Sequence, residues 1–202
     1  MPAKPVLLFD LGGVLVDVAP ADHMLASLGL TAEPSIVTRW AMIDAWIMFE
    51  TGELDAAKFA ALFAAEFSLD LDPASILLEF EAWNRRMFPG AVELLAELRM
   101  NYRLAVLSNT NEVHWRRLSG EFVIPELVDY AFASHLIGLR KPDARAYQHV
   151  AAEIGVRPAD LVFFDDNQAN VDGALALGIQ AWRVQGVTAL KERLTSLGYL
   201  PA

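Results

Sequence analysis

The 202-residue sequence predicts an α/β fold, in which a five-stranded parallel sheet carries helices on both faces and is interrupted once by a helical insertion. Two observations lead to this prediction. From Pro89 onward, short apolar runs alternate with amphipathic helical segments, which is the pattern of a parallel sheet. Between about Pro20 and Met87, the patterned segments have helical spacing and no run resembles a strand.

The first predicted strand is the continuous apolar run from Val6 to Phe9. Asp10 ends this run, and Gly12 and Gly13 allow a tight turn directly after it. A carboxylate at the C-terminal end of a buried strand lies where open α/β sheets bind their ligands. Asp10 also fits the role of a turn cap, and this stretch alone does not decide between the two.

The insertion that follows is predicted to be helical throughout. The first helix has one apolar face, marked by Ile36, Trp40, Ile43 and Ile47. A second helix is expected over 54–67. Asp72 and Pro73 form an N-cap and first-turn pair that opens a third helix, which extends to about Trp83. The aromatic surface of Trp40, Trp46 and Phe49 suits the core of this insertion, and a substrate lining or a dimer contact is the alternative.

The rest of the chain supplies the other strands and helices of the sheet. Helices are predicted over 92–99, 112–119, 142–154, 168–177 and 188–197, and strands over 104–107, 130–133, 161–164 and 179–184. Pro142 is expected at the start of its helix and Gly155 at the C-cap. The chain thus divides into an α/β core domain, residues 1–17 and 88–202, and an all-helical cap domain, residues 18–87, that projects over the strand ends.

Composition limits the classes of function. The formal net charge of −10 argues against nucleic acid and anionic membrane surfaces as partners. It is compatible with a small phosphorylated metabolite, because a metal and a few cations can reverse the field inside one cleft. Cysteine is absent, which excludes disulfides and thiol chemistry. No stretch approaches the roughly 18 apolar residues of a membrane span, so we expect a cytoplasmic protein. We expect it to be a monomer or a homodimer.

Polar residues follow three of the predicted strands. Asp10 follows the first, Ser108 and Asn109 the second, and Asp165 and Asp166 the fourth, while Lys141 precedes the helix that leads into the fourth. In a parallel sheet these ends share one edge, so the side chains converge on one cleft. Carboxylate pairs provide the oxygen ligands that Mg²⁺ prefers, and a lysine can neutralise a phosphoryl oxygen. A carboxylate beside a metal and a phosphate can attack phosphorus and form an aspartyl-phosphate.

These residues resemble the haloacid dehalogenase superfamily, subfamily IA, whose phosphotransferases carry an Asp, a Ser/Thr, a Lys and an acidic pair in this order. The runs Val-Leu-Ser-Asn-Thr-Asn (106–111), Leu-Arg-Lys-Pro-Asp-Ala-Arg-Ala-Tyr-Gln-His-Val (139–150) and Val-Phe-Phe-Asp-Asp-Asn (162–167) look especially similar to bacterial α-D-glucose-1-phosphate phosphatases. The resemblance spans the whole chain. It implies a Rossmann-like core with an inserted helical cap, and Mg²⁺-dependent hydrolysis of a small phosphomonoester such as a sugar phosphate.

The resemblance also implies a role for each motif residue. Asp10 would be the nucleophile and a Mg²⁺ ligand, and Gly12 would offer its backbone carbonyl to the metal. Asp166 would bind Mg²⁺ directly, and Asp165 through water. Two further roles concern the phosphoryl group: Ser108 and Asn109 would bind it, and Lys141 would steady it together with the nucleophile.

One position departs from most phosphatases of the superfamily. They carry a second Asp two positions after the nucleophile as general acid and base, and Gly12 stands there instead. The loss of such a group typically lowers the rate by about 10²–10⁴-fold. The glucose-1-phosphate phosphatases also have Gly at this position. Asp17, His23 or Asp44 from the cap side could substitute, and His114, His135 and His149 are expected to be structural.

Two other functions stay open. The first is a metal-independent 2-haloacid dehalogenase, because those enzymes also lack the second Asp and use their nucleophile on carbon. The adjacent pair Asp165 and Asp166 favours a metal and hence a phosphatase. The second is a catalytically weak protein that binds or senses a phosphate ligand, which the glycine at position 12 permits. Fold alone does not separate these functions, because the chemistry lies in the site.

Overall fold

The computed structural model describes residues 4–31, 33, 39 and 43–201. Its main sheet has five parallel strands in the order β5-β4-β1-β6-β7, which confirms the predicted fold class. The strands are β1 (Val6–Phe9), β4 (Arg103–Ser108), β5 (Tyr130–Ala133), β6 (Leu161–Asp165) and β7 (Gln180–Arg183). Since β1 lies between β4 and β6, the three strands with polar ends are direct neighbours.

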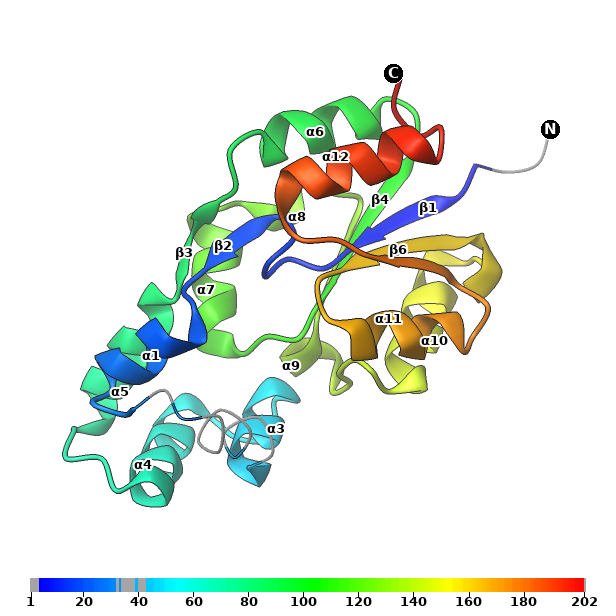
Figure 1. Ribbon diagram of the computed structural model, residues 1–202. Helices are drawn as coiled ribbons and strands as arrows, with labels where there is room; N and C mark the ends of the chain where they lie inside the picture. The colour runs from blue at the N-terminus through cyan, green and yellow to red at the C-terminus, as the bar shows by residue number, and fades with distance from the viewer. Residues whose placement is uncertain (1–3, 32, 34–38, 40–42, 202) are drawn as a thin grey trace.

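Alternate residues of the central strands face opposite layers of the fold. Leu7 and Phe9 of β1 pack into one apolar cluster and Val6 and Leu8 into another, as the period of two requires. The first layer contains α6 (Ala91–Arg99), α8 (Ile124–Leu127) and α12 (Gly186–Ser196), and the second contains α10 (Ala144–Ile154) and α11 (Gln168–Leu175). Figure 1 shows α6 and α12 on one side of the sheet and α10 and α11 on the other. The strands are therefore buried on both faces.

The insertion after β1 has its own apolar core. It comprises α1 (Ala21–Ser27), α3 (Asp44–Glu50), α4 (Ala56–Phe67) and α5 (Pro73–Ala82). Phe59, Phe63 and Phe80 are fully buried at its centre, with ring centroids 5.2–5.4 Å apart. Val113 of α7 (Glu112–Gly120) joins the same cluster, so this core also contacts the α/β part of the chain.

Several boundaries differ from the sequence prediction. The run from Pro20 to Met87 does contain a strand, β3 (Asn84–Met87), which pairs antiparallel with β2 (Val16–Val18). Its sequence, Asn-Arg-Arg-Met, is polar and has no apolar pattern from which a strand could be predicted. The strand forms because it pairs with β2. The helix expected from Pro142 begins instead at Ala144, where Asp143 is the N-cap and accepts from the backbone N–H of Arg145.

Other elements agree with the prediction or cannot be compared with it. Asp72 caps α5 and Tyr130–Ala133 forms β5, as expected. Of the predicted helix face, Ile36 and Trp40 lie outside the described residues, whereas Ile43 is the extended N-cap of α3, so the helix that contains Ile47 begins only at Asp44. The short helix α9 (Ser134–Ile137) follows β5 without a sequence signal. Among the described helices, none has both the length and the apolar character needed to cross a membrane.

Candidate active site

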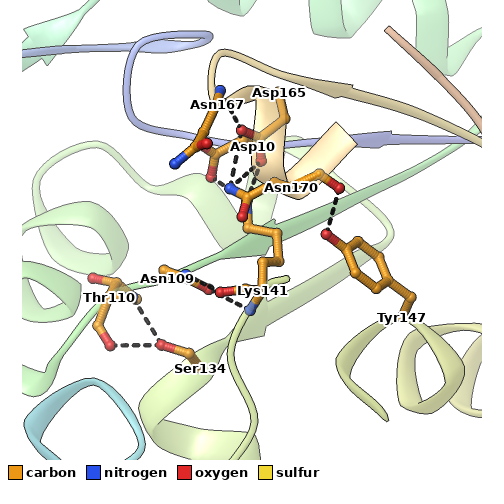
Figure 2. A network of polar contacts seen from close by, with 9 residues as sticks. All are labelled: Asp10, Asn109, Thr110, Ser134, Lys141, Tyr147, Asp165, Asn167 and Asn170. Carbon is orange, nitrogen blue, oxygen red and sulfur yellow. Dashed lines mark hydrogen bonds and ion pairs between the residues drawn. The ribbon is translucent and has the colours of Figure 1, made fainter. Parts of the chain in front are cut away.

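The carboxyl ends of β1, β4 and β6 bring the predicted site residues to one edge of the sheet. Asp10 follows β1 directly, Ser108 is the last residue of β4, and Asp165 is the last residue of β6. Lys141 reaches the same point from the segment before α10. Figure 2 shows its ammonium group between the side chains of the strand ends. The structure thus brings together side chains that are up to 155 positions apart in the sequence.

Lys141 forms the centre of the charge cluster. Its Nζ lies 2.8 Å from Oδ1 of Asp10 and 2.6 Å from Oδ2 of Asp165, and its side chain is 1% exposed. Burial lowers the pKa of Lys141, but the two carboxylates outweigh that effect and leave the pKa above its ordinary value. The ammonium therefore stays charged and holds one oxygen of Asp10 in a fixed position.

The surroundings of Asp10 disfavour the charged form of its carboxyl group. Burial raises the pKa of Asp10 to about 7, Lys141 opposes the shift, and the charges of Asp165 and Asp166 add to it. The three carboxylates lie together, with an oxygen of each within 4.8 Å of the others, and the Lys141 ammonium pairs with two of them, Asp10 and Asp165. Such a surplus of negative charge, presented through oxygen atoms, fits a hard divalent cation.

Asp165 is fully buried and already carries several hydrogen bonds. Its Oδ1 accepts from the backbone N–H of Asn167 at 2.8 Å, and Nδ2 of Asn170 lies 3.1 Å from both oxygens. The hydroxyl of Tyr147 in turn donates to the carbonyl of Asn170 at 2.7 Å. With Lys141 added, the acceptor positions of this carboxylate are filled by the protein. Its arrangement suits the orientation of Lys141 better than direct contact with a cation.

Asp166 is only partly buried, and its carboxylate lies against the backbone of Gly13. A Cβ atom on Gly13 would lie 2.2 Å from Oδ2 of Asp166, and the φ of Gly13 is +71°. Glycine is therefore required here for two reasons, backbone conformation and space. Burial and the neighbouring Asp165 raise the pKa of Asp166. The backbone carbonyl of Asp166 accepts from Nε of Arg183 at 2.8 Å, which fixes the strand end.

The segment after β4 positions Lys141 as well as its own side chains. Oδ1 of Asn109 accepts from the backbone N–H of Lys141, and Nδ2 donates to its carbonyl, each at 2.8 Å. The N–H of Thr110 donates to Oγ of Ser134, which donates back to the Thr110 carbonyl. Both polar atoms of the Asn109 side chain are thus engaged by the backbone, while Ser108 lines the open cavity.

A cavity of about 210 Å³ lies beside this cluster and extends under the insertion. Strand-end residues and Lys141 line one side. The other side has an apolar wall, which we define as Val18, Met24, Trp46, Trp83 and Leu118. Three polar residues near this wall are Glu50, Asn84 and His114. The cavity therefore has a charged end and a largely apolar end.

The suggested acid/base residues do not line this cavity. Asp17 pairs with Arg86 at 3.4 Å, His23 lies 3.4 Å from Arg85, and Asp44 is exposed at the start of α3. Glu50 does line it, although the sequence reasoning overlooked it. Its carboxylate is 2.9 Å from Arg140, and burial raises its pKa to about 7 against the effect of that arginine. No local motif marks Glu50, because only the packing of α3 brings it to the cavity.

Three comparisons relate the chain to known proteins. A family model described as haloacid dehalogenase-like hydrolase matches residues 5–178. Flavin mononucleotide hydrolase 1 of Arabidopsis thaliana is 27% identical over 195 residues, which cover 96% of this chain and 78% of that protein. (S)-2-haloacid dehalogenase 1 of Pseudomonas sp. (strain CBS-3) is also 27% identical, over 213 residues that cover 96% and 93%.

Solved structures share this fold, among them one that contains ligands. A HAD-family enzyme of Bacteroides thetaiotaomicron, crystallised in complex with magnesium and inorganic phosphate, aligns with a TM-score of 0.78 at 22% sequence identity. The alignment covers 91% of this chain and 95% of that one. The shared architecture therefore includes both the sheet and the insertion.

Proposed function

The chain belongs to the haloacid dehalogenase-like hydrolases, and from this premise we propose that it is a Mg²⁺-dependent phosphatase acting on a small phosphomonoester. The observation that carries the proposal is the cluster of three carboxylates, Asp10, Asp165 and Asp166, of which only the first two pair with the Lys141 ammonium. A divalent cation would neutralise the surplus negative charge, and a phosphate ester needs such neutralisation to approach a carboxylate. The Bacteroides neighbour, which binds magnesium and phosphate, supports the same proposal.

The residues present fit Mg²⁺ as the cation. Asp10 and Asp166 would hold it through carboxylate oxygens and Gly12 through its carbonyl, while the hydrogen bonds of Asp165 favour an indirect contact through water. When bound, the metal would supply charge neutralisation to the phosphoryl oxygens. Lys141 would hold Asp10 through Oδ1 and neutralise further phosphoryl charge. Ser108 would bind the phosphoryl group with its hydroxyl, and the segment at Asn109 with its backbone.

The proposed reaction has two steps. A carboxylate oxygen of Asp10 attacks phosphorus, the bond from phosphorus to the ester oxygen breaks, and the departing alcohol takes up a proton. Water then attacks the phosphorus of the aspartyl-phosphate, which releases inorganic phosphate and a proton and restores the Asp10 carboxylate. Because Gly12 has no side chain, the proton for the alcohol must come from elsewhere, so an ester with a good leaving group is favoured. The resemblance to glucose-1-phosphate phosphatases makes a sugar 1-phosphate the first candidate.

We propose that residues 18–87 act as the cap and residues 1–17 and 88–202 as the core. The cavity lies between the two, with residues of both in its lining. Closure of the cap over a bound ester would exclude bulk water from the aspartyl-phosphate until the alcohol has left. Because the insertion provides most of the apolar wall, it would also select the leaving group.

The similarity to (S)-2-haloacid dehalogenase 1 supplies the second candidate, attack of Asp10 on carbon without a metal. The acidic cluster argues against it, since without a metal three carboxylates would lie close together with the single ammonium of Lys141 to offset their charge. A weak phosphate-binding protein is the third candidate, because the site lacks an acid/base at Gly12. The three candidates differ in metal dependence and turnover, so they can be separated by experiment.

The test is phosphate release from a panel of sugar phosphates and an aryl phosphate, with Mg²⁺ and with EDTA. We expect turnover only with Mg²⁺, lost in Asp10→Asn and kept in the control Asp70→Asn, whose side chain is exposed. Halide release from a 2-haloacid in EDTA would establish the dehalogenase instead. Tight phosphate binding without turnover of any ester would establish the binding protein.

A further inference from the structure

Asn84 has a buried side chain that lines the cavity of the candidate site. The residue is 6% exposed, and its amide nitrogen Nδ2 has no hydrogen-bond partner among the described residues. A buried donor without an acceptor destabilises a folded protein, so such groups are rare unless something else supplies the acceptor. The position in a cavity that also contains Asp10 indicates that the missing acceptor belongs to a ligand.

A β-bulge in the β2–β3 ribbon directs Asn84 toward the site. Asp17 pairs with Arg86, whereas Val18 pairs with Asn84, so Arg85 is the additional residue on β3. Without this shift, Asn84 would not lie opposite Val18. Bulges beside functional sites commonly reorient a side chain in this way. The bulge therefore gives a second, independent reason to connect Asn84 with the cavity.

Val18 connects Asn84 with the turn that follows Asp10. Opposite residues of an antiparallel pair lie on the same face of the ribbon, so Asn84 and Val18 share a face. A Cβ atom on Gly12 would lie 3.3 Å from Cγ2 of Val18. Gly12 is two residues from Asp10, at the position where the general acid is missing. Asn84 thus lies opposite the residue that borders the space at Gly12, in the cavity that Asp10 also lines.

The other polar groups near the apolar wall already have partners. Nε2 of His114 lies 2.8 Å from the carbonyl of Phe80, and its Nδ1 lies 3.3 Å from Asn111. Glu50 pairs with Arg140. Thr110 also has a buried hydroxyl without a partner, but it follows Ser108 and Asn109 at the charged end of the cavity. Asn84 is therefore the described side chain near the wall with an unpaired donor.

We propose that Asn84 is a substrate-binding residue that donates a hydrogen bond from Nδ2 to an oxygen of the leaving group. The inference rests on the proposed phosphatase function and specifies the class of ester. The leaving group would combine apolar surface, which packs on the wall, with one acceptor oxygen beyond the ester oxygen, from a hydroxyl, ether or carbonyl group. A site that hydrogen-bonds such an oxygen discriminates against analogues without it, because its own polar group would then stay unpaired.

The test compares Asn84→Leu with the wild type on two sets of esters. Leucine has the same number and branching of side-chain heavy atoms as asparagine, and it removes the donor. One set contains plain alkyl and cyclohexyl phosphates, and the other contains their hydroxylated counterparts with the same carbon number. We expect kcat/KM for the hydroxylated set to fall by roughly tenfold or more, since one hydrogen bond is lost in the transition state. The kcat/KM for the plain set of esters should not change, and neither should inhibition by inorganic phosphate.

The thermal midpoint of the ligand-free protein separates binding from a structural role. We expect Asn84→Leu to melt at the same temperature as the wild type or higher, because the unpaired amide nitrogen is replaced by an apolar group. A lower midpoint for both Asn84→Leu and Asn84→Ala would show that the amide supports the fold and would overturn the assignment. The exposed residue Asn101, changed to leucine, is the matched control and should alter neither measurement.

The kinetic outcomes also distinguish this inference from the proposed function. Equal losses on both ester sets, or no loss on either, would overturn the role of Asn84 while the phosphatase stands. If the wild type released no phosphate from any ester with Mg²⁺, the phosphatase would fail, and the role of Asn84 would fail with it. Asn84→Ala repeats the comparison if the leucine variant does not fold.

Discussion

Asn109 holds the backbone of Lys141 through both polar atoms of its side chain, with Oδ1 accepting from the N–H and Nδ2 donating to the carbonyl, each at 2.8 Å. The two residues are 32 positions apart and belong to different segments of the sheet edge. This pair of hydrogen bonds fixes the point from which the Lys141 side chain reaches Asp10 and Asp165. A residue expected to contact the phosphoryl group thus also positions the cation of the site.

The first prediction concerns this link. Asn109→Ala removes both hydrogen bonds and lets the Lys141 backbone move, so we expect kcat/KM for phosphate esters to fall by up to about 100-fold, the effect of a displacement near 1 Å. Steady-state kinetics with Mg²⁺ measures it. The exposed Asn101→Ala is the control and should retain wild-type kinetics. Unchanged kinetics in Asn109→Ala would show that Lys141 is held by its ion pairs alone.

The second prediction concerns the charge of Lys141. Lys141→Met keeps a long side chain but leaves Asp10 and Asp165 buried without their cation. We expect the free energy of unfolding in EDTA at pH 8 to fall by about 3–5 kcal/mol, the usual cost of breaking a buried ion pair. Urea denaturation measures it. Lys191→Met removes an exposed lysine and should change stability little, so equal effects of the two variants would contradict this account.

Much of the sheet edge could be predicted from the sequence because its signals are local. The apolar runs before Asp10, Ser108 and Asp165 mark buried strands, and a parallel sheet necessarily gathers their ends. Lys141 could be placed near them by its position before a helix that leads into β6. The structure adds the distances that turn these residues into one charge cluster.

The rest of the site depends on contacts between distant segments. Glu50 and Asn84 reach the cavity only through the packing of α3 and the bulged pairing of β3, and neither leaves a pattern in the sequence. The role of Asp165 also depends on tertiary contacts. In the sequence, its adjacency to Asp166 indicates a metal ligand. Only the structure shows that Asn167 and Asn170 occupy its oxygens. Tertiary contacts, which have no fixed spacing along the chain, account for these gaps.

The third prediction uses the close approach of Gly13 to Asp166. In Gly13→Ala the new Cβ would meet the carboxylate at 2.2 Å, so Asp166 must move. We expect the affinity for Mg²⁺, measured by calorimetry, to fall by about 10–100-fold, as when the surroundings of a metal ligand are altered. Gly29→Ala is a matched control, because its φ is +74° and no atom lies within 4 Å of the new Cβ.

Both glycine variants share the backbone cost of a positive φ. We expect each to lose about 1–2 kcal/mol of unfolding free energy in EDTA, since alanine disfavours this conformation. Only Gly13→Ala should also lose Mg²⁺ affinity and phosphatase activity. If Gly29→Ala weakened Mg²⁺ binding as much, the effect would come from general destabilisation and not from displacement of Asp166.

The last prediction concerns His114, which connects α7 to the end of α5. Its Nε2 lies 2.8 Å from the carbonyl of Phe80, and burial lowers its pKa from an ordinary 6.5 to about 4. The unfolded chain therefore binds a proton at His114 below about pH 6.5, whereas the folded chain does so only near pH 4. Stability from this group is present above pH 6.5 and is lost as the pH falls toward 4.

His114→Gln keeps an amide donor for the Phe80 carbonyl but removes the titrating group. Between pH 6.5 and 4, we expect the wild type to lose up to about 3 kcal/mol more unfolding free energy than this variant, since one pKa unit corresponds to about 1.4 kcal/mol. Urea denaturation across this range measures the difference, and comparison with the wild type cancels the carboxylates common to both proteins. His149→Gln leaves His114 in place, so the unfolding free energy of this variant should fall with pH as steeply as that of the wild type. Parallel pH profiles for the wild type and His114→Gln would mean that His114 takes up its proton in the folded protein as readily as in the unfolded chain.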